Sequence, residues 1–257
     1  MSFDISEIQF SRWITPIANQ EKTISRLVEL AKDHSDNELE NFEKDPALVP
    51  NQEDFTSKYA LYTLESIFGT VKFIFRHKRL IDTFLNFNGI GSTPFIVKGI
   101  GEHEHGLTAI IDLIGPSGLT LKAFAPDYYI FRDLYALDNV INVQFFAWAL
   151  SAEEQTNPIK MKRPDGKIVT TAGSSVLLPE QRKNIDEYVY QFNAQEIEEN
   201  IFEHTTLLAK VKTRLAILEK TEIPLNLYIS EKIMQNDFFP QKGNDILGVC
   251  VLACKII

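Results

Sequence analysis

The sequence predicts an α+β protein in which an N-terminal helical segment precedes two antiparallel β modules. Two observations favour this class. Before residue 88 the apolar residues recur every three or four positions, as on one face of a helix, whereas from Thr93 onward they alternate with a period of two. In the later region, residues 119–150 and 223–254 also share one order of apolar strands and polar loops.

The bulk composition is that of a globular protein with an acidic surface. The 257 residues are 44% hydrophobic and carry a net charge of −9, which disfavours unaided attraction to nucleic acid or anionic lipid. No apolar run is long enough to span a membrane, and the first residues do not resemble a secretory signal. We therefore expect no membrane association.

The two cysteines, Cys250 and Cys254, lie in one apolar ending. A disulfide between them is disfavoured, because two residues four positions apart on a strand have Cα atoms roughly 13 Å apart. We interpret them as buried free thiols, which indicates a reducing, cytoplasmic compartment.

Residues 1–92 form the predicted helical N-terminal region. An amphipathic helix is expected from about Glu21 to His34, and an acidic, exposed connection from Asp36 to Glu53. A long helix is then expected from about Glu53 to Phe87, since its apolar residues keep helical spacing. A strand over Thr70–Phe75 is the alternative, because Val71, Phe73 and Phe75 alternate and Gly69 interrupts the helix pattern.

Residues 93–178 and 179–257 form the two predicted β modules. The first contains four strand patterns and an added hairpin over residues 159–170, closed by a Pro-Asp-Gly turn. The second contains four strand patterns of its own. The expected strands are 95–101, 107–114, 119–125 and 140–150 in the first module, and 188–192, 205–217, 223–230 and 246–254 in the second.

The two modules align with each other. Placed without gaps, Leu119 meets Ile223 and Phe124 meets Tyr228, and after a two-residue shift Phe146 meets Leu252 and Ala147 meets Ala253. Identities are few. An internal duplication and chance alternation among β sequences both account for the pattern. Superposition of the two blocks distinguishes them, because only duplicated blocks should superpose.

Three strands, a connecting loop and further β structure, in that order, resemble the OB-fold. The ending Gly243-Asn244-Asp245-Ile246-Leu247-Gly248-Val249 is similar to the entry into a late strand of OB-like barrels, and to the endings of functionally uncharacterised bacterial proteins. The resemblance covers residues 94–257 and implies tandem OB-like barrels or meanders. Each block has only four convincing strands, so either a barrel is incomplete or the two blocks share one sheet.

The resemblance implies a binding platform on the third strand of each block. Phe124 and Tyr228 would face outward at matching places, next to Lys122 and Asn226, and OB-like surfaces stack nucleic-acid bases on such aromatic rings. The alternative is that this face packs against the other block or the N-terminal helices. The acidic net charge favours the packing alternative.

His103 and His105 are the candidate metal ligands, since on an extended chain they would project to one side. A third ligand would have to come from elsewhere, for instance His77, His204 or Asp112. The alternative, which we prefer, is a solvated turn between two strands with no metal. We assign no catalytic residue and no cofactor.

These observations lead to three functional hypotheses. The first is a non-enzymatic cytoplasmic protein that binds another protein, as an adaptor, a regulator or a toxin-neutralising partner. The second is single-stranded nucleic-acid binding through the OB-like modules, which the net charge disfavours. The third is a metal-dependent enzyme that uses His103 and His105.

Overall fold

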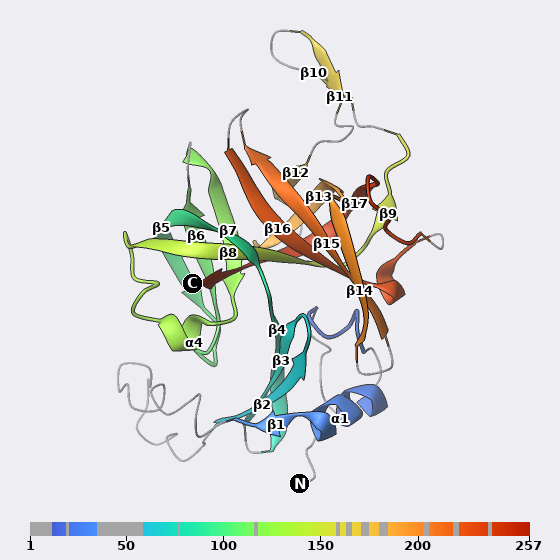
Figure 1. Ribbon diagram of the computed structural model, residues 1–257. Helices are drawn as coiled ribbons and strands as arrows, with labels where there is room; N and C mark the ends of the chain where they lie inside the picture. Colours follow the sequence, from blue (N-terminus) through green and yellow to red (C-terminus); the bar gives the residue numbers. More distant parts are fainter. Residues whose placement is uncertain are drawn as a thin grey trace.

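β-Strands make up most of the fold (Figure 1). The computed structural model describes residues 12–18, 21–34, 59–76, 78–115, 118–157, 160–162, 166–170, 175–179, 185–202, 206–217, 221–235 and 238–257. Within these ranges the helices are α1 (Glu21–Leu30), α4 (Tyr128–Phe131) and the 3₁₀ helix η4 (Glu231–Ile233). The strands are β1 (Lys32–Asp33), β2 (Tyr59–Ser66), β3 (Gly69–Arg76), β4 (Arg79–Phe87), β5 (Ile90–Glu102), β6 (Ala109–Ile114), β7 (Thr120–Ala125), β8 (Val140–Ala149), β9 (Glu153–Glu154), β10 (Lys160–Lys162), β11 (Ile168–Thr170), β12 (Val176–Pro179), β13 (Glu187–Asn193), β14 (Glu196–Phe202), β15 (Thr206–Ile217), β16 (Thr221–Ser230) and β17 (Asp245–Ile256).

The helix predicted from about Glu21 to His34 is confirmed over Glu21–Leu30, but Lys32–Asp33 form the strand β1 instead. α1 has the expected apolar stripe and buries Ile24, Leu27 and Val28. The connection predicted over residues 36–53 lies outside the described residues. Between the helix and the β modules the structure has a four-stranded antiparallel sheet in the order β1-β2-β3-β4, which we call the N-terminal sheet.

The predicted helix over residues 53–87 is wrong in the part that the structure describes. That stretch forms β2, β3 and β4, and the strand alternative over Thr70–Phe75 coincides with β3. The physical reason is that the sheet is covered on both sides: Val71 to Phe75 are buried without interruption. A strand buried on both faces loses the alternation that identifies a strand in a sequence.

Five strands form a closed barrel in the order β5-β6-β7-β17-β8, and β8 pairs with β5 again to complete the circle. The pairing of β7 with β17 is parallel and the other four are antiparallel. Four of these strands come from residues 90–149, with α4 connecting β7 to β8. The fifth, β17, comes from the C-terminal end of the second block.

The second block follows the same path. β13 pairs with β17, β17 with β8, β8 in parallel with β16, and β16 with β15, which pairs with β14. β14 continues β13 after only Ala194 and Gln195, so the chain itself completes this circle. Here the strand from outside the block is β8. With β13 and β14 counted as one continued strand, each block thus has four strands of its own and borrows the fifth.

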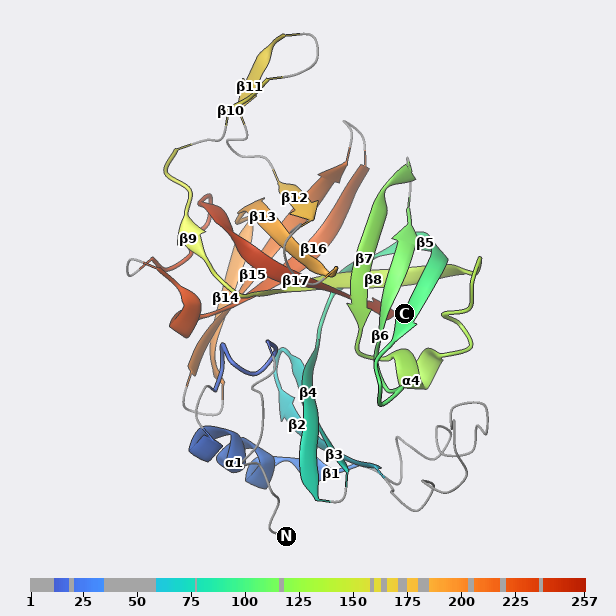
Figure 2. The ribbon, with the colours of Figure 1, turned by 180° about the vertical axis from the view of Figure 1, so that it is seen from behind.

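The borrowing is reciprocal, because β8 and β17 cross and pair with each other (Figures 1 and 2). At the crossing Leu252 pairs with Ala147 and Ala253 pairs with Phe146. The sequence alignment matches Phe146 with Leu252 and Ala147 with Ala253. If each residue is replaced by its match, the pair Leu252–Ala147 becomes the pair Phe146–Ala253. The two blocks share one eleven-stranded sheet, as one of the sequence alternatives proposed. The duplication and the domain boundaries at residues 92 and 178 stay predictions.

The buried residues form two clusters. One fills the insides of the barrels and includes Leu121, Ala123 and Leu227. The other lies between the barrels and the N-terminal sheet and includes Phe87, Phe124 and Tyr228. The N-terminal sheet is therefore packed against the outside of the barrels. Cys250 and Cys254 are buried free thiols, as expected. Within the described ranges, no helix is long and apolar enough to cross a membrane.

Candidate functional site

Phe124 and Tyr228, the rings of the expected platform, are not on the surface. They are 2% and 0% exposed, because the N-terminal sheet and the segment before α1 cover them. The ring of Trp13 lies 4.5 Å from that of Phe124, and the ring of Phe87 lies 4.8 Å from that of Tyr228. The two rings are packed, as the alternative proposed, but the N-terminal sheet and the segment before α1 cover them, and not helices.

The polar neighbours of these rings are also engaged. Lys122 donates from Nζ to both oxygens of Asp112, at 2.8 and 2.9 Å. Asn226 is buried and donates from Nδ2 to the main-chain oxygen of Asn88 at 2.9 Å, an oxygen that Tyr228 also reaches at 2.7 Å. A platform of Phe124, Tyr228, Lys122 and Asn226 open to a ligand is therefore corrected to a packed seam between sheet and barrels.

His103 and His105 lie side by side, with ring centroids 5.9 Å apart, and within the protein His105 uses both ring nitrogens and His103 uses Nδ1. His105 Nδ1 accepts the amide hydrogen of Leu107 at 3.1 Å, so in the neutral ring Nε2 carries the proton and donates to Asp82 at 2.9 Å. His103 Nδ1 lies 2.9 Å from the hydroxyl of Thr108. Burial, and then the neighbouring His105, lower the pKa of His103.

No group of three His, Cys, Asp or Glu side chains suited to a metal occurs among the described residues. Asp112, one proposed third ligand, is paired with Lys122. His77 and His204, the other two, lie outside the described residues. His105 instead connects the loop before β6 to β4 through Asp82, which gives this histidine a structural role.

A polar cavity of about 690 Å³ lies beside β9. Its lining includes the Glu153-Glu154 pair, and Glu154 accepts a hydrogen bond from Asn244 Nδ2 at 2.9 Å. The Asn244 side-chain oxygen in turn accepts the amide hydrogen of Gln241 at 2.7 Å. These contacts fix the loop before β17 against β9. They give the side chains of Asn244 and Glu154 a structural role that needs no ligand.

A different surface surrounds β14, and we call it the β14 surface: Glu65, Ile67, Glu198, Glu199 and Ile201. β14 pairs with β15 along one edge, and no described strand pairs with its other edge. A hollow of about 220 Å³ lies where the end of β14 meets the β2–β3 turn. Ile67 and Ile201 border this hollow and are 65% and 60% exposed.

The strand geometry explains why Ile201 is exposed. Residues 197 and 201 lie on the same side of β14, since side chains alternate along a strand. Ile197 packs against the barrel interior, but four residues later β14 has passed the end of the barrel core, and Ile201 faces solvent. Phe68, next to Ile67, contacts β15 instead: Lys210 Nζ lies 5.7 Å from the centre of its ring.

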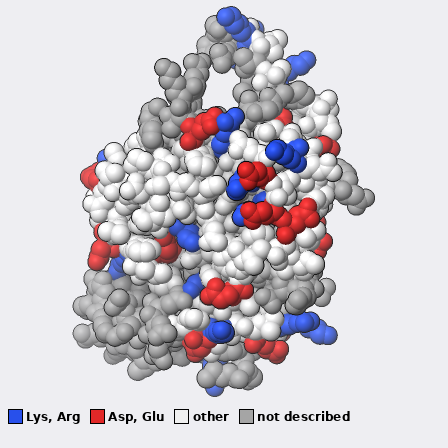
Figure 3. Space-filling model, viewed as in Figure 1, with Lys and Arg blue, Asp and Glu red and all other residues white. Residues whose placement is uncertain are grey.

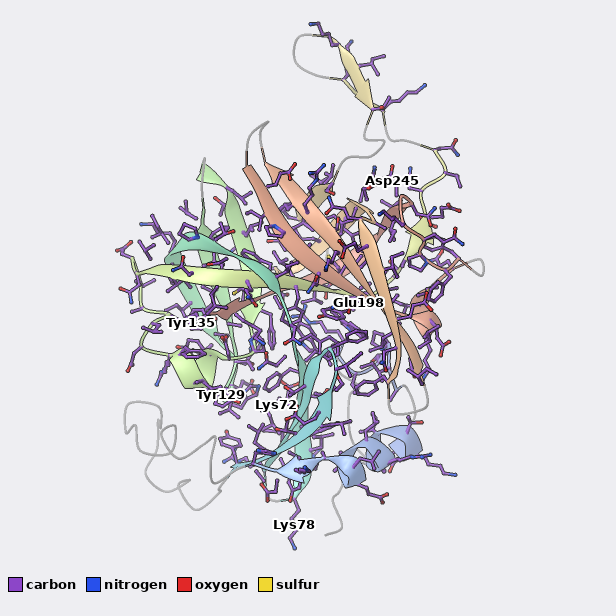
Figure 4. All side chains as sticks on the ribbon, in the orientation of Figure 1. Lys72, Lys78, Tyr129, Tyr135, Glu198 and Asp245 are labelled. Atoms are coloured by element: carbon purple, nitrogen blue, oxygen red, sulfur yellow. The ribbon has the colours of Figure 1, made fainter. Side chains whose placement is uncertain are left out.

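Ion pairs line the other side of β14, to which Glu196 and Glu198 point. Lys212 pairs with Glu196, Lys210 with Glu198 at 2.5 Å, and Arg214 with Glu222 at 2.6 Å. Figure 3 shows acidic and basic side chains alternating over β14, β15 and β16, and Figure 4 labels Glu198 on β14. Glu65 and Glu199 are exposed and have no cationic partner among the described residues. The β14 surface is therefore an acidic rim around two exposed isoleucines.

The sequence interpretation missed β14. It assigned no strand between the expected strands 188–192 and 205–217. The available signal was Ile197 and Ile201 within a run of acidic residues, a pattern typical of an edge strand whose charges discourage pairing.

No protein-family model matches the sequence, and no curated protein is similar to it. Among solved structures, a molybdate-bound form of the cytoplasmic molybdate-binding protein ModG is similar, with 11% sequence identity and a TM-score of 0.32. The similarity covers 66% of this chain and 99% of that chain. At this TM-score it assigns neither a ligand nor a function.

Proposed function

We propose that this chain is a non-enzymatic, cytoplasmic protein-binding protein built on two OB-type barrels. The strand order and the position of α4 after the third strand support the OB description. The observation that carries the binding function is the β14 surface, where exposed apolar side chains adjoin a strand edge without a described partner. Strand edges and apolar spots with polar rims are two surface features that proteins use to bind one another.

The two other hypotheses lack such a feature. Base stacking requires an open ring face, and Phe124 and Tyr228 are buried under the N-terminal sheet. A metal site on both rings would have to displace existing contacts, because His105 uses both nitrogens on Leu107 and Asp82 and His103 uses Nδ1 on Thr108. The protein-binding hypothesis needs no rearrangement of these contacts.

Site-specific photo-crosslinking tests the proposal. A photo-reactive amino acid would replace Ile201 in the full chain, and as a matched control it would replace Ile168 on β11, which is 68% exposed. We expect one protein of the native host to be crosslinked in stoichiometric amount from position 201, and to be displaced by an excess of the unmodified chain. The proposal fails if position 201 captures nothing, or captures the same set of proteins as position 168.

A further inference from the structure

We propose that β14 binds an extended, basic segment of its partner by strand addition, in which the segment becomes an additional strand beside β14. This inference rests on the proposed function and names the partner's chemistry. Among described residues, the backbone groups of residues 196–201 bond only within the β14–β15 pair. The seven residues of β14 thus offer main-chain donors and acceptors along one free edge.

The charge of the edge selects the partner. The edge and its neighbourhood carry the carboxylates of Glu196, Glu198, Glu199 and Glu65. Lys212 and Lys210 neutralise the first two, which leaves two excess negative charges. Acidic residues on an edge repel acidic strands, and a second copy of this chain would present the same edge. A segment with lysine or arginine side chains removes the repulsion and neutralises Glu199.

The position of the hollow adds a sequence requirement. Glu199 and Ile201 lie on one side of β14, two residues apart, so the partner residues opposite them are also two apart. One should be basic, opposite Glu199, and the other apolar, beside Ile201 and at the hollow that Ile67 and Phe68 border. An antiparallel segment then reads apolar-x-basic, and a parallel segment reads basic-x-apolar.

Fluorescence anisotropy with synthetic peptides tests this inference on the intact protein. The probe is a labelled peptide as long as β14, Thr-Ile-Thr-Lys-Thr-Lys-Thr, and its reverse, Thr-Lys-Thr-Lys-Thr-Ile-Thr, tests the other direction. A third peptide has the sequence of the tighter binder but is N-methylated at alternate residues. We expect N-methylation on the pairing edge to weaken binding by about tenfold or more, because it removes several main-chain donors while leaving every charge in place.

Two variants locate the binding site. Glu199→Lys is expected to weaken binding of the peptide by about fivefold, a loss that grows at low salt. Glu104→Lys, which makes the same charge change in the exposed loop between β5 and β6, should leave it unchanged. Equal binding of the N-methylated peptide, or equal loss in both variants, would show that attraction is general electrostatics and would overturn the inference.

The two proposals fail separately. If position 201 crosslinks a partner but neither peptide binds, protein binding stands and the basic strand addition is wrong. If position 201 captures nothing, the proposed function is wrong, whatever the peptides do.

Discussion

At the scale of single residues, Asp127 is the carboxylate that fixes β17, the strand from the second block, in the first barrel. It is 2% exposed and accepts hydrogen bonds from the Tyr135 hydroxyl at 2.7 Å and from the amide of Ile256 in β17 at 2.9 Å. Figure 4 labels Tyr135 beside α4. Burial raises the pKa of Asp127 to about 6 despite these two donors.

The raised pKa of Asp127 predicts a pH dependence of stability. Between the ordinary value of 3.8 and about 6 the folded state binds the proton more tightly than the unfolded state, so the free energy of unfolding falls as pH rises through this window. Asp127→Asn removes the titration. The melting temperature of the wild type should therefore decline relative to that of Asp127→Asn between pH 4 and pH 7. A constant difference between the two across this range would contradict the assignment.

Arg12 predicts a second effect on stability. Its guanidinium donates to both oxygens of the fully buried Asp186, at 2.7 and 2.5 Å, and to Glu187 at 3.1 Å. Arg12→Met would leave a buried carboxylate without its cation and lower the free energy of unfolding by about 3 kcal/mol. The matched control, Lys98→Met, breaks an exposed pair with Asp138 and should change it by less than about 1 kcal/mol. Denaturant unfolding measures both, and similar losses would be inconsistent with this role.

At the scale of elements, Gly248 allows β17 to pass close to the segment that follows β8. A Cβ at this position would lie 2.0 Å from the main-chain oxygen of Ser151, an atom that also accepts from Tyr190. Gly248→Ala should therefore force β17 away and lower the melting temperature by several degrees. Gly101→Ala is the control, because its nearest neighbour would be 3.8 Å away. Equal melting temperatures for the two variants would contradict this close approach.

Elements whose faces differ in burial were predictable, and those buried on both faces were not. α1 follows from its one-sided apolar stripe, and the pairing of β10 with β11 lies within the hairpin predicted over residues 159–170. β3 carries five consecutive buried residues, and in such a run helical spacing arises by chance. The pattern of apolar residues in a single sequence indicates how much of an element is buried. It does not indicate what covers the other face of a sheet.

At the scale of the whole molecule, the alignment of the two blocks could be written from the sequence. The exchange of β8 and β17 between the blocks could not. The equivalence of Phe146 with Leu252 can be written from the sequence, but the pairing of Ala147 with Leu252 joins residues more than a hundred positions apart. The same limit applied to the site. Phe124 and Tyr228 were correctly placed outside the barrels, yet only the path of the N-terminal sheet shows that they are covered.

The β14 surface lies at one edge that this architecture leaves open, while the two barrels complete each other and the N-terminal sheet covers their shared side. Hydrogen–deuterium exchange of the intact protein, with and without the tighter-binding of the two labelled peptides, tests binding at this surface most directly. We predict that the amides of residues 196–202 exchange more slowly when the peptide is bound, while those beside the larger cavity, at residues 153–157 and 241–244, keep their rates. Slower exchange at the cavity with none along β14 would contradict binding at this edge.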